Sequence, residues 1–215
     1  MKPVNNSFSI VLIGSWNPGI FTQADWVIEN LIEDREQTVE IAMPLNDPNN
    51  TPRIAFEDQN IFVNAGSLTI IPKHQTVEGL KKSAALAEKI LLLLTHTPIS
   101  KCGVNFSFSI DVDDKTNSLT QALLASDESD LLVNSSGRMI SKVVERSIEI
   151  KDSVLNLRIA EHNNLVEMRF NYHHETGSNS QFRTMLANSN DAIDRYFKLA
   201  TDICQSVYEL ELETN

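Results

Sequence analysis

Cysteine is scarce in this chain, and its scarcity excludes most structural metal sites. Only two of the 215 residues are cysteines, Cys102 and Cys204, and they lie about a hundred residues apart in the chain. The five histidines show no H-x-x-x-H or H-x-H spacing, so no zinc-ligand pattern can be assembled locally. We therefore expect two lone buried thiols in a reducing compartment, with a disulfide between the halves as the alternative.

Glycine is also scarce, and the motifs that depend on it are missing. With seven glycines, the chain contains neither a G-x-x-x-x-G-K phosphate loop nor a G-x-G-x-x-G dinucleotide fingerprint. It also lacks the G-x-S-x-G turn that presents a nucleophilic serine. We expect no cofactor, and a non-enzymatic role is favoured over catalysis.

Positive charge is the third scarcity. Lys and Arg number 18 against 29 Asp and Glu, which gives a formal net charge of −11 and makes binding to nucleic acid or anionic lipid unfavourable. The most apolar helical run, residues 90–94, follows Glu88 and Lys89 and falls short of a membrane span. Residues 10–13 are too few for a secretory signal. These features predict a cytoplasmic protein with no nucleic-acid or membrane partner.

What the chain does contain is an order of elements that occurs twice. Alternating and amphipathic patterns predict a strand, a helix, several short strands and a long helix in the first half. These fall at residues 8–13, 24–34, 39–43, 53–57, 60–63, 67–71 and 76–94. Thr22 with Asp25 resembles a capping box for the first helix.

The second half repeats this order from about residue 103. Its predicted elements are a long alternating strand, a short helix capped by Ser118, four further strands and a final helix. These fall at residues 104–112, 118–125, 131–133, 143–148, 155–159, 166–172 and from 191 onward, with 181–187 ambiguous. Residues 7–10 and 107–110 share the tetrapeptide Ser-Phe-Ser-Ile.

The repeated order predicts an α+β fold in a single domain, residues 1–215, with half-repeats at 7–97 and 101–210. Each β-α-β(3–4)-α half supplies apolar strand faces and a helix to cover them, so we expect one curved antiparallel sheet with helices on one face. The other face would carry the polar residues of the alternating strands. These are Asn105, Ser107, Ser109, Asp111, Asn156, Arg158, Glu167, Arg169 and Asn171.

This duplicated order is similar to the saddle of the TATA-box-binding-protein fold. That family binds DNA with a basic surface and apolar wedges, whereas this chain is acidic, so the resemblance implies the topology without the DNA role. The segment 17–21, Asn-Pro-Gly-Ile-Phe, followed by Trp26, resembles the opening of a sporadically distributed family of uncharacterised bacterial proteins with a similar duplicated layout. That resemblance implies no activity.

Three sets of side chains are candidates for a site. Asp111, Asp113 and Asp114 either hold a hard cation or flank a turn before the next helix. Trp16, in a turn, either anchors a partner or covers the edge of the core. Arg158 and Arg169, on facing strands, either bind an anion or pair across the sheet with Glu167.

Together these features predict a binding protein that holds a protein partner, basic in character, on its open sheet face or its sheet edges. One alternative is an enzyme or small-ligand binder with a cleft between the halves. Another is self-association as a homodimer through sheet edges. The residues expected to contact a ligand or partner are Trp16, Asn105, Asp111, Asn156, Arg158 and Arg169.

Overall fold

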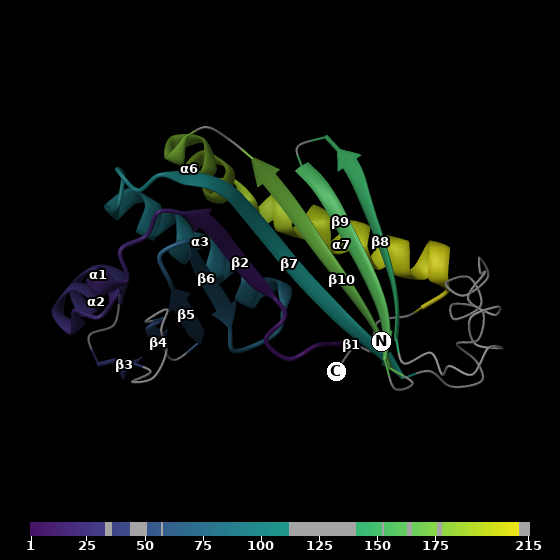
Figure 1. Cartoon of the computed structure of the whole chain (residues 1–215), viewed down its shortest axis with the longest axis horizontal. Helices are drawn as coiled ribbons and strands as arrows, with labels where there is room; N and C mark the ends of the chain where they lie inside the picture. Colours follow the sequence, from purple (N-terminus) through teal and green to yellow (C-terminus); the bar gives the residue numbers. More distant parts are fainter. Residues whose placement is uncertain are drawn as a thin grey trace, which may run out of the picture.

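The computed structural model describes residues 1–32, 36–43, 51–56, 58–111, 141–151, 153–162, 165–175 and 178–210. Over these residues the protein is an α+β fold, built on one open antiparallel sheet of ten strands with helices packed on one side (Figure 1). The predicted fold class is therefore confirmed. The opposite side of the sheet, here called the open face, carries no helix among the described residues.

Among the described residues, the first half contains six strands and three helices. They are β1 (Lys2–Pro3), β2 (Ser9–Gly14), α1 (Pro18–Phe21), α2 (Ala24–Leu31), β3 (Glu40–Ala42), β4 (Arg53–Ala55), β5 (Gln59–Val63), β6 (Ser67–Pro72) and α3 (Val77–Leu93). The described part of the second half contains four long strands and two helices. They are β7 (Ile99–Asp111), β8 (Ser141–Ile150), β9 (Ser153–His162), β10 (Leu165–Glu175), α6 (Asn179–Ala187) and α7 (Ser189–Tyr208).

The strand order is arranged about the central pair β2 and β7. It runs β3-β4-β5-β6-β2-β7-β10-β9-β8, and β1 also pairs with β7. β6, the last strand of the first half, lies beside β2, and β10, the last strand of the second half, lies beside β7. From each of these two strands a meander continues to the edge of the sheet. Residues far apart in sequence are brought into register here, with Ser9 opposite Asn105 and Asn105 opposite Asn171.

The core lies between the sheet and its helices. Alternate residues of β7, including Phe106 and Phe108, are buried on the helix side. The ring of Phe197 on α7 lies 5.5 Å from that of Phe106 and 6.0 Å from that of Phe108, in edge-to-face geometry. Such contacts add to the free energy of burial because ring edges and faces carry opposite partial charges. Helix α3 contributes a fully buried stripe that includes Leu80 and Leu91.

Several local expectations are corrected by the structure. Thr22 does not cap α2: it ends α1, and its hydroxyl donates to the Gly19 carbonyl at 2.9 Å. Helix α2 ends at Leu31 and does not extend to residue 34 as the periodicity predicts. The ambiguous segment 181–187 is helical. The predicted helix 118–125 and strand 131–133 lie outside the described residues.

No helix within the described ranges combines the length and the apolar character needed to cross a membrane.

Candidate binding groove on the open face

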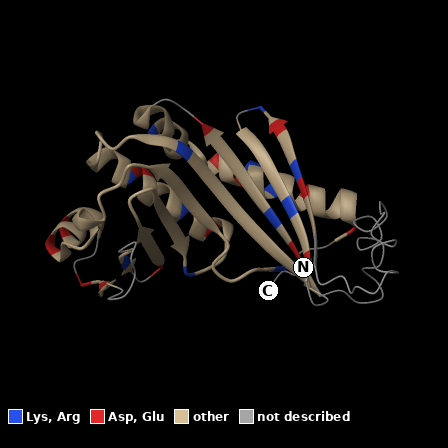
Figure 2. Ribbon diagram, viewed as in Figure 1, with Lys and Arg blue, Asp and Glu red and all other residues tan. Residues whose placement is uncertain are grey.

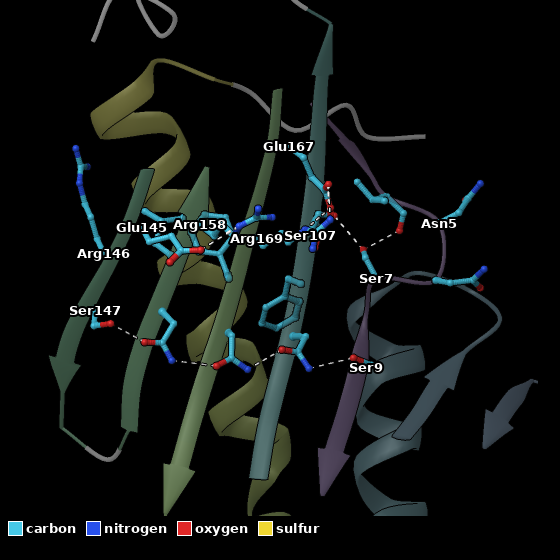
Figure 3. Close-up of a pocket in the computed structure, with 18 residues that line it drawn as sticks. Asn5, Ser7, Ser9, Ser107, Glu145, Arg146, Ser147, Arg158, Glu167 and Arg169 are labelled. Atoms are coloured by element: carbon cyan, nitrogen blue, oxygen red, sulfur yellow. Dashed lines mark hydrogen bonds and ion pairs between the residues drawn. The ribbon is translucent and has the colours of Figure 1, made fainter. Parts of the chain in front are cut away.

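A groove of about 620 Å³ lies on the open face, between the N-terminal segment and the strands β7, β10, β9 and β8 (Figure 3). It is called the face groove below. Asn and Ser make up nine of its 18 lining residues, so half of the side chains that line it are polar and uncharged. These nine are Asn5, Asn6, Ser7, Ser9, Asn105, Ser107, Ser147, Asn156 and Asn171.

Five of these side chains form one hydrogen-bonded chain across five adjacent strands, here called the amide row. Its members, from β8 to β2, are Ser147, Asn156, Asn171, Asn105 and Ser9. Ser147 Oγ donates to Asn156 Oδ1 at 2.8 Å, and Asn156 Nδ2 donates to Asn171 Oδ1 at 3.1 Å. Asn171 Nδ2 donates to Asn105 Oδ1 at 2.7 Å, and Asn105 Nδ2 donates to Ser9 Oγ at 3.0 Å.

Strand register accounts for the amide row. Ser147, Asn156, Asn171, Asn105 and Ser9 are successive partners in the four strand pairings that connect β8 to β2. Opposed residues on neighbouring strands have their Cβ atoms about 5 Å apart, within reach of short amide side chains. The residues flanking each asparagine are apolar and buried against the helices, so the pleat turns the amides to the open face.

Each asparagine of the row has donor and acceptor groups that the row itself does not use. A carboxamide offers two N–H donors and two acceptor lone pairs, and the row uses one of each at Asn156, Asn171 and Asn105. No described side chain takes up the remaining N–H and lone pair. Because all the bonds run in one direction, each polarises the next, which strengthens the chain.

A second row of the face groove is charged and balanced. Arg158 Nε donates to Glu145 at 3.1 Å across β9 and β8. Arg169 donates to both oxygens of Glu167 at 2.7 and 2.8 Å. In Figure 2 the basic and acidic residues lie side by side on these strands. These two arginines and two glutamates cancel. The remaining charged residue of the lining, Arg146, donates to the Tyr208 hydroxyl at 2.8 Å, so the groove carries no excess of negative charge.

These pairs refine the expected role of the arginines. Glu167 lies two residues from Arg169 on the same strand, so this pair is not cross-strand, and Arg158 pairs with Glu145 instead of Glu167. The hydrogen bond to Glu167 raises the pKa of the Arg169 guanidinium above its ordinary value. Arg158 and Arg169 are directly opposite each other in register, which places two like charges side by side, each compensated by its own glutamate.

The N-terminal segment forms one wall of the groove. Val4 N donates to the Ser107 carbonyl at 2.9 Å, and Ser7 Oγ donates to the Val4 carbonyl at 2.7 Å. Asn6 adopts a left-handed backbone conformation with φ of 58°, which asparagine tolerates better than most residues. These bonds hold residues 4–7 against β7, where Asn5 and Asn6 line the groove.

Of the six residues expected to bind a ligand or partner, four lie in the face groove: Asn105, Asn156, Arg158 and Arg169. Trp16 does not. Its side chain is 5% exposed, and Nε1 donates to the Leu12 carbonyl at 3.2 Å. Of the two roles that the sequence leaves open for Trp16, its burial agrees with the second, cover for the edge of the core, because the ring folds back onto the core beside Phe21.

The remaining expected residue, Asp111, is the last residue of β7, and Asp113 and Asp114 lie outside the described residues. Several parts of the groove were not among the six expected site residues, including Asn171 at the centre of the amide row, Ser9, Ser147 and the N-terminal wall. The only signal in the sequence for Ser9 and Ser147 is their position in an alternating strand. That signal does not show which strands become neighbours in the sheet.

The two thiols and the two adjacent histidines, which could carry reactive chemistry, lie outside the lining of the face groove. Burial raises the pKa of both the Cys102 and the Cys204 thiols from 9.0 to about 12, and neither forms a disulfide. His173 and His174 point to opposite faces of β10, as their adjacency predicts. His173 contacts Glu175, while His174 bonds the Tyr196 hydroxyl in the core.

Within the described ranges, no three His, Cys, Asp or Glu side chains are grouped so that they could hold a metal ion. The chemistry that the face groove offers is therefore hydrogen bonding by uncharged amides and hydroxyls beside two ion pairs. Such a surface can hold a polar ligand, and its arrangement does not supply a nucleophile with an adjacent base.

The comparison with known proteins adds no family: no protein-family model matches the chain, and no curated protein sequence matches it.

Proposed function

We propose that this chain is a non-enzymatic cytoplasmic protein that binds another protein in the face groove, as an assembly or neutralising subunit. Its two halves are taken as a duplicated unit with the topology of the TATA-box-binding-protein saddle, without the DNA role. The net charge of −11 favours a partner that carries positive charge around its contact with the groove.

The amide row is the observation that carries this proposal. Hydrogen-bonding groups on Asn156, Asn171 and Asn105 are half-buried and face outward, and a binding partner can satisfy them. The row crosses five strands, which at about 4.8 Å per strand spacing gives it a length of about 19 Å. That length suits a protein segment better than a single metabolite.

The open shape of the groove also favours a protein over a small ligand. Pockets for small molecules are usually concave and mostly apolar, with a few convergent polar groups. Here Asn and Ser make up half of the lining residues, and four of the five charged ones are already paired with one another. A cleft enzyme would need a free acid or base at that position.

Site-specific photo-crosslinking tests the proposal. A photoreactive residue at Ser147, in the groove, should crosslink a stoichiometric protein in the native host. The same residue at Asn190, exposed on α7, serves as the matched control and should not. Mass spectrometry then identifies the crosslinked species and its contact site.

Three outcomes would overturn the proposal. Crosslinks of equal yield from Ser147 and Asn190 would mean that the groove is not selective. A second copy of this chain as the crosslinked species would support the homodimer alternative, which light scattering can check independently. A bound metabolite, with no crosslinked protein, would support the small-ligand alternative.

A further inference from the structure

We propose that the amide row recognises the main chain of an extended, uncharged segment of the partner, laid across the strands from β8 to β2. This inference rests on the proposed function and names the feature of the partner that the groove recognises, its main chain. It follows from the chemistry of the row, its length and the charge balance beside it.

The free groups of the row complement a peptide backbone. Asn156, Asn171 and Asn105 each retain one N–H and one lone pair among the described contacts. A peptide unit also presents one N–H and one C=O, and in an extended chain these remain available for pairing. Carboxamides can therefore bond the backbone of a segment whatever its side chains are.

The dimensions fit a short segment. The row spans four strand spacings, or about 19 Å at about 4.8 Å each, and an extended chain advances about 3.3 Å per residue. About six residues would therefore cover the row from Ser147 to Ser9. The N-terminal wall is held against β7 by the bond from Val4 N to the Ser107 carbonyl at 2.9 Å, two residues along the strand from Asn105 of the row.

The charged row explains why the segment needs no charge of its own. Glu145 and Glu167 already neutralise Arg158 and Arg169, at 3.1 and 2.7 Å. A charged side chain entering the groove would have to displace one of these pairs. Binding through neutral dipoles is screened little by salt, so affinity for the segment should change little with ionic strength.

Gly103 supplies a second, independent probe of the row. It lies on β7 on the same face as Asn105, and a Cβ added there would lie 2.9 Å from Asn171 Nδ2. That distance is too short, so Gly103→Ala should displace the Asn171 amide without removing any member of the row. The variant therefore tests whether the position of the Asn171 amide matters while the amide itself is still present.

The test uses heptapeptides selected from a random display library on the full chain. We expect the selected peptides to be rich in uncharged residues. N-methylation of successive backbone amides should weaken binding by roughly tenfold at the positions that contact the row, because each methyl removes one donor. Alanine replacement of the peptide side chains should have less effect. Fluorescence anisotropy measures both series.

Variants of the protein itself provide a second test with the same peptides. Asn171→Leu and Gly103→Ala should each weaken the unmethylated peptide, Asn171→Leu by roughly tenfold, whereas Asn190→Leu on α7 should leave its affinity unchanged. Circular dichroism and a thermal melt verify that each variant is folded. If Asn171→Leu unfolds, Gly103→Ala and the methylation series still decide the question.

The inference is overturned if no peptide is selected, if affinity depends on side chains and not on N-methylation, or if it falls steeply with salt. Any of these results can occur while Ser147 still crosslinks a protein, in which case the proposed function stands and main-chain recognition does not. Loss of the Ser147 crosslink, with peptide binding intact, would instead overturn the proposed function alone.

Discussion

At the scale of the residue, Asn171 is the centre of the amide row. It accepts from Asn156 at 3.1 Å and donates to Asn105 at 2.7 Å. Its neighbours Phe170 and Tyr172 are fully buried on the other side of β10. One residue thus connects the hydrogen bonding of the groove to the strand that packs against α7.

We expect Asn171→Ala to lower the free energy of unfolding by about 1–3 kcal/mol, since two hydrogen bonds of about 1 kcal/mol each are lost. Urea denaturation measures the change. A double-mutant cycle with Asn105→Ala should give a coupling energy above zero, because the bonds polarise one another. Strict additivity of the two substitutions would contradict the cooperative row.

The two thiols give a second prediction at this scale. Cys102 and Cys204 are buried, and burial raises the pKa of each to about 12. Native protein at pH 8 should therefore resist alkylation by iodoacetamide, and both thiols should react in denaturant, as counted by intact mass. Rapid alkylation of the native protein would show that one of them is accessible.

The same shift gives stability a pH dependence with a definite sign. The unfolded chain loses thiol protons near the ordinary pKa of 9.0, whereas the folded chain keeps them up to about pH 12. The unfolded state thus binds fewer protons between these values, and the free energy of unfolding should fall as pH rises through this window. Below pH 9 the contribution is fully present. Denaturant titrations from pH 8 to 10, compared with Cys204→Ala, isolate the thiol contribution.

At the scale of the element, caps define where helices begin. Thr76 precedes α3, and its hydroxyl accepts from Gly79 N at 3.1 Å. A polar N-cap satisfies a backbone donor that has no partner within the helix. Asn17 does the same for α1 by accepting from Gly19 N, with Pro18 in the first turn.

We expect Thr76→Ala to destabilise the fold by about 1 kcal/mol, as is usual for loss of an N-cap. Thermal or urea denaturation measures it, and Thr76→Ser, which retains the hydroxyl, is the control. Equal losses in the two variants would mean that the cap bond is not what stabilises α3.

Element prediction succeeded where one periodicity dominated the sequence. The alternation in β7 and β10 and the long stripe of α3 were visible because one face of each element is buried. It failed at residues 17–31, where Thr22 lies between two short helices and serves the first of them. It was ambiguous at α6, whose polar face leaves only Phe182 and Leu186 fully buried.

At the scale of the whole molecule, charge decides which partners are excluded. The net charge of −11 opposes polyanions. Of the three arginines that line the face groove, Arg158 and Arg169 are paired with glutamates, and Arg146 donates to the Tyr208 hydroxyl. We therefore expect no retention on heparin at low ionic strength. Salt-sensitive retention would require a basic surface elsewhere on the chain and would reopen the nucleic-acid role.

The amino-acid sequence by itself determined the α+β class, the single sheet with one polar face, the acidic character and the two lone cysteines. These properties depend on composition and on local periodicity, which each segment carries independently. Four of the six expected site residues, Asn105, Asn156, Arg158 and Arg169, could be assigned to the open face because they stand on the polar side of an alternating strand.

Only the tertiary structure decided which of those residues meet. Ser9, Asn105, Asn156 and Ser147 come from four strands and from both halves of the chain, and the order β2-β7-β10-β9-β8 brings them into one row with Asn171. The choice between the two roles expected for Trp16 was decided in the same way, since its burial depends on Phe21 and on the end of β2. Strand order and register are long-range properties, set by how the apolar faces pack together, and no local pattern encodes them.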